Sequence, residues 1–136
     1  MKRCLTATLL VLLAAGACAA QTARVGREFK IQVGGGVTLD GGRLRLRFAR
    51  VAEDSRCPVD VDCVWAGNAE VLVEAGGKGW KGKATLKLDT NESGQGASEA
   101  RYGRYTLKLV SLSPQRRSDR KVAPGEYTAT LLVSKE

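Results

Sequence analysis

The chain has 136 residues, of which 22 are Lys or Arg and 14 are Asp or Glu, and its formal net charge is +8. This length suits one domain with a single core, and 43% hydrophobic with 26% charged residues is typical of a globular protein rather than a disordered one. The sequence contains no histidine, which excludes Ser-His-Asp and Cys-His catalysis and His-ligated metal sites.

Residues 1–20 have the composition of a secretory signal peptide. Lys2 and Arg3 form a charged start, an apolar stretch covers residues 9–15, and small residues complete the segment. The apolar stretch is shorter than the roughly 20 residues of a membrane-spanning helix, so a signal is expected rather than a membrane anchor. Without this segment, which holds two basic residues and no acidic one, the net charge falls from +8 to +6. We therefore expect export, with residues 21–136 as a single mature domain.

Two processing routes remain open for this segment. Cleavage after Ala19 or Ala20 would release a soluble protein. The run Ala15-Gly16-Ala17-Cys18 also resembles a bacterial lipobox, although that motif favours a larger aliphatic residue at the position of Ala15. A lipidated Cys18 would tether the domain to a membrane face without a spanning segment. The expected location is therefore the periplasm or the exterior, either free or as a lipoprotein.

Only two cysteines, Cys57 and Cys63, lie outside the leader. In an exported protein a disulfide between them is the default expectation. The alternative is a metal or redox site, but their spacing is not the C-x-x-C of redox proteins and further ligands are lacking. We predict a Cys57–Cys63 bridge that fixes one short loop.

After the leader, apolar and polar residues alternate with a period of two, which predicts antiparallel strands with one buried and one solvated face. Glycine clusters separate several of the alternating segments, and no amphipathic helix pattern is found. The sequence predicts an all-β fold, a single antiparallel β-sandwich or small barrel of six to seven strands. The segments are residues 29–33, 44–48, 69–75, 80–88, 105–109 and 127–133, with a seventh at 37–39.

Finer expectations follow from the strand phases. If residues 76–79 form a hairpin loop, Ala75 pairs with Trp80, and the broken alternation at Arg50 predicts a bulge or a strand end. The expected buried residues are Leu46, Phe48, Val71, Val73, Leu86, Leu107, Leu109, Ala129 and Leu131. The expected exposed residues are Arg45, Arg47, Glu70, Lys83 and Lys108. The polar segments 89–104 and 113–124 are expected to be exposed loops, the second of them basic.

The segment 54–67 holds the most distinctive pattern of the chain. It reads Ser-Arg-Cys-Pro from Ser55, then four residues, then Cys-Val-Trp-Ala-Gly from Cys63. This pattern resembles a family of small exported bacterial proteins that are secreted or lipoprotein β-domains. The resemblance implies the compartment and the fold, and it carries over no activity. Trp65 could pack over the edge of the core and the disulfide, or it could lie on the surface of a rigid recognition loop.

Charged side chains supply the other candidate sites. Cations crowd two predicted strands, and such a face could attract anionic lipid or polysaccharide, or could simply be solvated and partly neutralised by Glu70 and Glu74. No aromatic residues interleave these cations, so nucleic acid is not an expected partner. Asp54, Asp60 and Asp62 could bind calcium, or pair with Arg50 or Arg56. The cations of this face are Arg43, Arg45, Arg47, Arg50, Lys81, Lys83 and Lys87.

These observations favour a non-catalytic exported binding or scaffold domain of the bacterial cell envelope. Its partner would be an anionic lipid or polysaccharide, or an envelope protein. The alternative is an inhibitor or protein-binding module that presents the disulfide-pinned loop 54–67. We expect no catalytic residue, metal or cofactor, and the binding candidates are Trp65, Arg45, Arg47, Lys81 and Lys83.

Overall fold

A computed structural model describes residues 21–90 and 97–136. The expected signal peptide and the lipidation site Cys18 lie outside the described residues, as does the middle of the expected loop 89–104.

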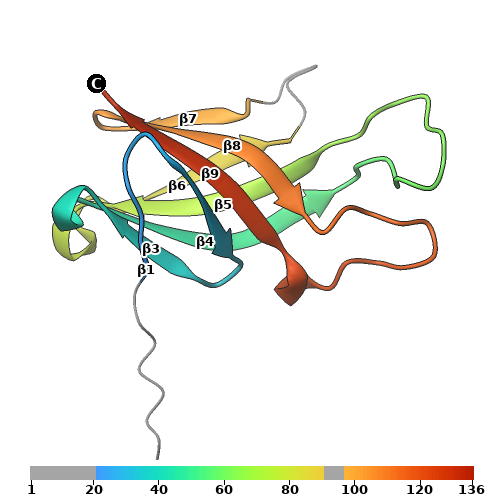
Figure 1. The fold of residues 1–136 in the computed structure, drawn as a ribbon, viewed down its shortest axis with the longest axis horizontal. Coiled ribbons are helices and arrows are strands. Elements are labelled where there is room, and N and C mark those ends of the chain that lie inside the picture. Colours follow the sequence, from blue (N-terminus) through green and yellow to red (C-terminus); the bar gives the residue numbers. More distant parts are fainter. Residues whose placement is uncertain (1–20, 91–96) are drawn as a thin grey trace, which may run out of the picture.

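The described residues form nine strands in two sheets that enclose one core (Figure 1). The first sheet has the order β1-β3-β4-β5-β6 and the second β2-β9-β8-β7. All neighbouring strands pair antiparallel except β1 and β3. The strands are β1 (Gln21–Thr22), β2 (Glu28–Gln32), β3 (Gly36–Leu39), β4 (Leu44–Asp54), β5 (Ala69–Gly76), β6 (Ala84–Asp89), β7 (Glu99–Tyr102), β8 (Tyr105–Ser113) and β9 (Thr128–Lys135).

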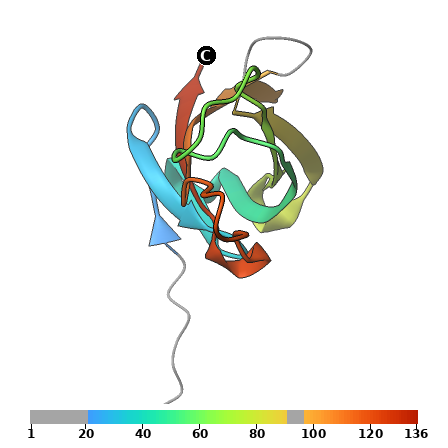
Figure 2. The same ribbon diagram turned by 90° about the vertical axis from the view of Figure 1, so that its right-hand side faces the viewer.

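This architecture confirms the predicted all-β sandwich, and the helical elements of residues 21–90 and 97–136 are three short 3₁₀ turns. The turns are η1 (Asp40–Gly42), η2 (Lys78–Trp80) and η3 (Pro124–Glu126). Seen from one end, the two sheets wrap around a common interior (Figure 2). Two strands exceed the predicted number, because β1 is only a short parallel addition to β3 and β7 lies in the segment expected to be a loop.

The core follows the predicted strand phases closely. Phe48, Val71 and Leu107 are fully buried, and all but one of the residues expected in the core are buried. The exception is Leu86, which is only half-buried because β6 is the edge strand of its sheet. Among the residues expected to be exposed, Arg47, Lys83 and Lys108 are exposed, and Arg45 and Glu70 are half-buried.

The predicted pairing of Ala75 with Trp80 is wrong. Ala75 lies opposite Ala84, because Trp80 leaves the strand ladder in η2 with a φ of 60°. The connection is therefore longer than expected. The register shifted by an even number of residues, so the inward faces of β5 and β6 still meet.

The predicted irregularity after Phe48 is confirmed. The pairing of β4 with β5 shifts between Phe48 and Arg50 and again between Val51 and Glu53. Bulges bend a strand and redirect its side chains. Here the strand ends at Asp54, whose side chain is only 8% exposed. This buried carboxylate lies at the base of the loop that follows β4.

Candidate functional site

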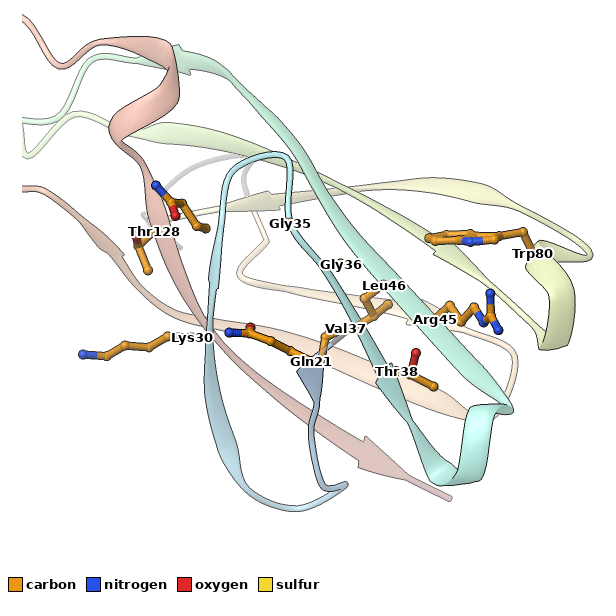
Figure 3. Close-up of a pocket in the computed structure, with 11 residues that line it drawn as sticks. Gln21, Lys30, Gly35, Gly36, Val37, Thr38, Arg45, Leu46, Trp80 and Thr128 are labelled. Carbon is orange, nitrogen blue, oxygen red and sulfur yellow. The ribbon is translucent and has the colours of Figure 1, made fainter. Parts of the chain in front are cut away.

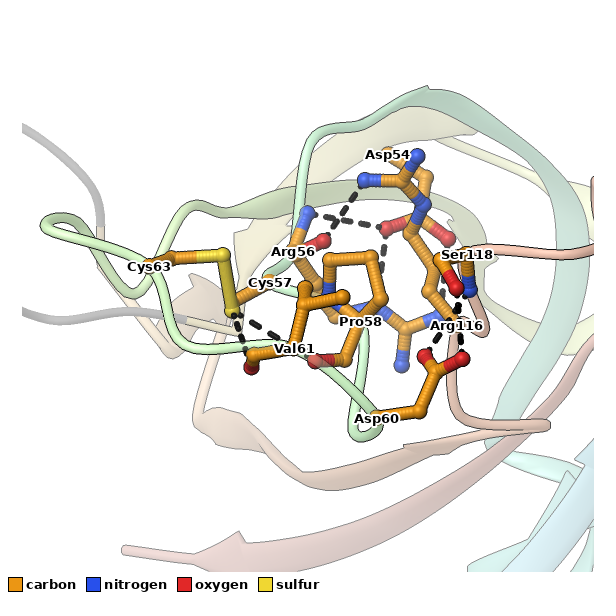
Figure 4. The surroundings of a disulfide bond; sticks show 9 residues. All are labelled: Asp54, Arg56, Cys57, Pro58, Asp60, Val61, Cys63, Arg116 and Ser118. Carbon is orange, nitrogen blue, oxygen red and sulfur yellow. Dashed lines mark hydrogen bonds and ion pairs between the residues drawn. A yellow bond between two sulfur atoms is a disulfide. The ribbon is translucent and has the colours of Figure 1, made fainter.

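The connection between β4 and β5, residues 55–68, is named here the disulfide loop, and it extends from one end of the sheets (Figures 1 and 4). Cys57 and Cys63 are joined by a disulfide with their Cα atoms 5.9 Å apart, as predicted. At the neck of the loop the N–H of Ser55 donates to Asn68 O at 2.7 Å, and the N–H of Cys57 donates to Ala66 O at 2.9 Å. The bridge and the neck together close the loop at two levels.

Gly67 allows the two sides of the neck to approach each other. Its φ is +69°, a left-handed conformation that glycine adopts without strain. A Cβ at this position would overlap the carbonyl oxygen of Ser55. Only glycine fits here, which explains the last residue of the motif.

Arg56 anchors the loop to both sheets. Its Nε and Nη2 donate to the two oxygens of Asp54 at 2.8 and 2.7 Å, a bidentate pair with both side chains largely buried. Nη1 also donates to Leu112 O at 2.8 Å, and Nη2 to Pro114 O at 3.0 Å. One side chain thereby joins the end of β4 to the end of β8 and the segment that follows it.

The connection between β8 and β9 supports the loop from the side (Figure 4). Arg116 Nη1 donates to Arg56 O at 2.6 Å, and the N–H of Val59 donates to Arg116 O at 3.0 Å. The N–H and hydroxyl of Ser118 both donate to the carboxylate of Asp60. The basic loop predicted at 113–124 therefore serves in part as a structural support.

Two carboxylates at this end, Asp54 and Asp60, have lowered pKa values. Burial alone would raise the pKa of Asp54, but the hydrogen bonds and charge of Arg56, with a hydrogen bond from Tyr127, hold it below its ordinary value. Burial and the same Asp54 contact raise the pKa of Tyr127 to about 12. The hydrogen bonds from Ser118 lower the pKa of Asp60. Asp54 and Asp60 thus stay ionised and committed to internal donors.

The tip of the loop presents apolar side chains to solvent. Val64 is 94% exposed and Trp65 is 82% exposed, so the reading in which Trp65 packs over the core edge is wrong. Five large hydrophobic side chains are exposed in the described part of the chain, and four of them lie on this loop. The four are Val59, Val61, Val64 and Trp65, and the fifth is Val110 on β8. Clustered exposed apolar residues mark interaction surfaces.

The exposure of the tip separates the residues of the motif that build the loop from those that face solvent. The residues whose contacts or conformations build the loop are Ser55, Arg56, the two cysteines and Gly67. Val64 and Trp65 bury little surface and add little to stability. Sequence reasoning identified Trp65 but missed Val59, Val61 and Val64, which lie between two predicted strands.

The bridge leads to a stability prediction. Replacing both Cys57 and Cys63 with serine should lower the free energy of unfolding by about 2 kcal/mol, because the bridge closes only a short loop. Arg56 and the sheet hydrogen bonds remain, so amide exchange should accelerate most in residues 57–66, and in β5 only by the roughly 30-fold that the lower global stability implies. Urea denaturation and hydrogen exchange test this. Acceleration no greater in residues 57–66 than in β5, or free thiols in the wild-type protein, would contradict it.

The predicted basic face also exists, on the outer surface of the first sheet, and several of its cations are paired with glutamates, whereas Arg45 and Arg50 make no ion pair within the described residues. Arg47 and Lys83 both lie against Glu74, at 3.5 and 3.1 Å, and Lys87 lies 2.9 Å from Glu70. Such exposed pairs contribute little stability but cancel much of the surface potential. Lys81 lies apart from this face, exposed in the connection between β5 and β6.

Metal sites, membrane helices and similar proteins give no further evidence on function. In residues 21–90 and 97–136, no group of three or more His, Cys, Asp or Glu side chains is placed to hold a metal ion. The same residues contain no helix that is long and apolar enough to cross a membrane. A scan against protein-family models and searches of curated proteins and of solved structures found no match to this chain.

Proposed function

We propose that this chain is a non-catalytic binding domain of the bacterial cell envelope, which engages a protein partner through the tip of its disulfide loop. The signal-like residues 1–20 and the disulfide are compatible with export. The observation that carries the proposal is the concentration of exposed apolar side chains on this one loop.

The chemistry of the tip favours a protein over an anionic surface. Tryptophan is among the residues that dominate binding energy in protein interfaces, and its large ring fills a pocket at low entropic cost. Asp62 is exposed on the same loop, three residues before Trp65, and an acidic side chain there opposes approach to anionic lipid or polysaccharide. Three cations of the outer face that could have attracted such a surface, Arg47, Lys83 and Lys87, are paired with Glu74 or Glu70.

The anchoring of the loop supports the same proposal. Ordering a flexible loop on binding would cost free energy for each side chain immobilised. Here the bridge, Gly67 and Arg56 have already ordered the backbone before a partner arrives. A rigid convex loop of this kind fits a concave surface on its partner, as the exposed loops of protein inhibitors do.

Site-specific photo-crosslinking tests this proposal. A photoreactive phenylalanine analogue replaces Val64, which is 94% exposed on the tip, or Val110, which is 41% exposed on β8. The two variants make the same substitution of an exposed valine, so they differ only in location. We expect a discrete crosslinked protein from position 64 in cell-envelope extract, absent from position 110 and lost when Trp65→Ala is added. A partner captured from position 110 but not from position 64 would refute the proposal.

A further inference from the structure

A groove of about 630 Å³ lies on another part of the molecule and shares no residue with the disulfide loop (Figure 3). Lys30 and Gln32 of β2 border it on one side, and Arg45 of β4 and Trp80 of η2 border it on the other. Thr38 of β3 lies between them. The volume is that of a site for a small organic molecule rather than for a single inorganic ion.

Two glycines contribute to the lining of the groove, beside Val37 and Leu46. Gly35 and Gly36 join β2 to β3 and carry no side chains that would fill the space. The Trp80 ring lies close over Gly76, where a Cβ would come within 2.7 Å of Trp80 Cε3. Trp80 itself has a φ of 60°, which is unusual for a bulky residue and costs conformational energy. This strained backbone holds an aromatic ring at the edge of the groove.

The charges that line the groove have one sign. Lys30 and Arg45 contribute cations, and none of the lining residues carries a carboxylate. Unlike Arg47 and Lys83, neither makes an ion pair within the described residues. Arg45 Nε is buried and has no hydrogen-bond partner there, so no internal acceptor fixes the guanidinium. Uncommitted cations beside a cavity favour an anionic ligand.

The remaining lining groups favour a sugar. Gln21, Gln32, Thr38 and Thr128 offer amides and hydroxyls that can both donate to and accept from ligand hydroxyls. The Trp80 ring offers an apolar face to the C–H groups of a pyranose. We propose that this groove binds an oligosaccharide that carries carboxylates, such as a uronic-acid polymer, independently of the protein partner of the disulfide loop.

Titration of the purified protein with trigalacturonate, monitored by NMR, tests the groove, with maltotriose as the uncharged probe. We expect chemical-shift changes at the backbone amides of Gly35 and Gly36. The acidic trisaccharide should also bind at least about tenfold more tightly than maltotriose, because maltotriose lacks the carboxylates that can accept charge-assisted hydrogen bonds. Inorganic phosphate should not compete at equal concentration. No shifts at these amides, equal affinity for maltotriose, or equal competition by phosphate would each overturn the proposal.

Three variants locate the binding. Two substitutions, Lys30→Gln and Arg45→Gln, should each weaken trigalacturonate binding by about tenfold. Lys30 is exposed on β2, so its replacement should leave the fold intact. Trp80→Gly removes the ring but accepts a φ of 60° without strain, and should weaken binding of the acidic trisaccharide by a similar factor. Arg47→Gln is the matched control, because Arg47 lies on the same strand, is paired with Glu74 and does not line the groove. Unchanged affinity in Lys30→Gln, or an equal loss in Arg47→Gln, would overturn the assignment.

Discussion

Replacing Gly67 with alanine should destabilise the domain by about 3 kcal/mol, as measured by urea denaturation. The left-handed φ of +69° accounts for about 1 kcal/mol of this loss. The rest comes from the new Cβ, which would overlap the carbonyl of Ser55 and force the neck of the disulfide loop apart. The hydrogen bond between Ser55 and Asn68 would break with it.

Gly79→Ala is the matched control for this prediction. Gly79 has nearly the same φ, +68°, but a Cβ there would meet nothing within 4 Å. The Gly79→Ala substitution should therefore lower the free energy of unfolding only by the cost of the left-handed φ, about 1 kcal/mol. Equal losses in the two variants would show that the close approach at the neck is not required.

Replacing Arg56 with methionine should also cost about 3 kcal/mol at neutral pH. The substitution leaves the Asp54 carboxylate, only 8% exposed, without its cation, and it removes the donors to Leu112 O and Pro114 O. Arg101→Met is the control, because Arg101 lies 2.6 Å from Glu136 with both side chains about two-thirds exposed. That variant should lose less than about 0.5 kcal/mol.

The pH dependence of the Arg56 variant carries a definite sign. In the wild type the pKa of Asp54 is lowered, so the stability that its ionisation contributes is present above its ordinary pKa near 4 and is lost as the pH falls through the lowered value. Without Arg56, burial raises the pKa of Asp54. Protonation of Asp54 at low pH then removes the free-energy cost of an unpaired buried charge in the variant. The stability difference between wild type and Arg56→Met should therefore shrink between pH 7 and about pH 3. A difference that is constant over this range would contradict the role assigned to Asp54.

Much of the fold could be predicted from the sequence because the alternation of apolar and polar residues is a local property. Val71 and Leu107 are buried as their strand phases require. β7 could not be predicted, because Glu99–Tyr102 is too short to show a clear pattern and becomes a strand only by pairing with β8. The position of Trp80 was missed because its φ of 60° ends the alternation without any local signal.

The candidate sites could also be predicted only in part from the sequence. The disulfide followed from the cysteine count and the expected compartment, whereas the exposure of Trp65 did not. Contacts of Arg56 with residues 56 and 58 positions away determine how the loop leaves the sheets, and no local pattern reports them. The groove is still less accessible to sequence reasoning, since both sheets contribute its walls.

We propose the tip of the disulfide loop as the binding surface of the domain. The most direct test is the dissociation constant of the crosslinked partner, once purified, for the wild type, Trp65→Ala and Val110→Ala. Trp65 is 82% exposed, so its loss should change the free energy of unfolding by less than about 0.5 kcal/mol. It should nevertheless weaken binding by about 30-fold or more, as expected for a central tryptophan, with Val110→Ala binding like the wild type. Wild-type affinity in Trp65→Ala would contradict the account.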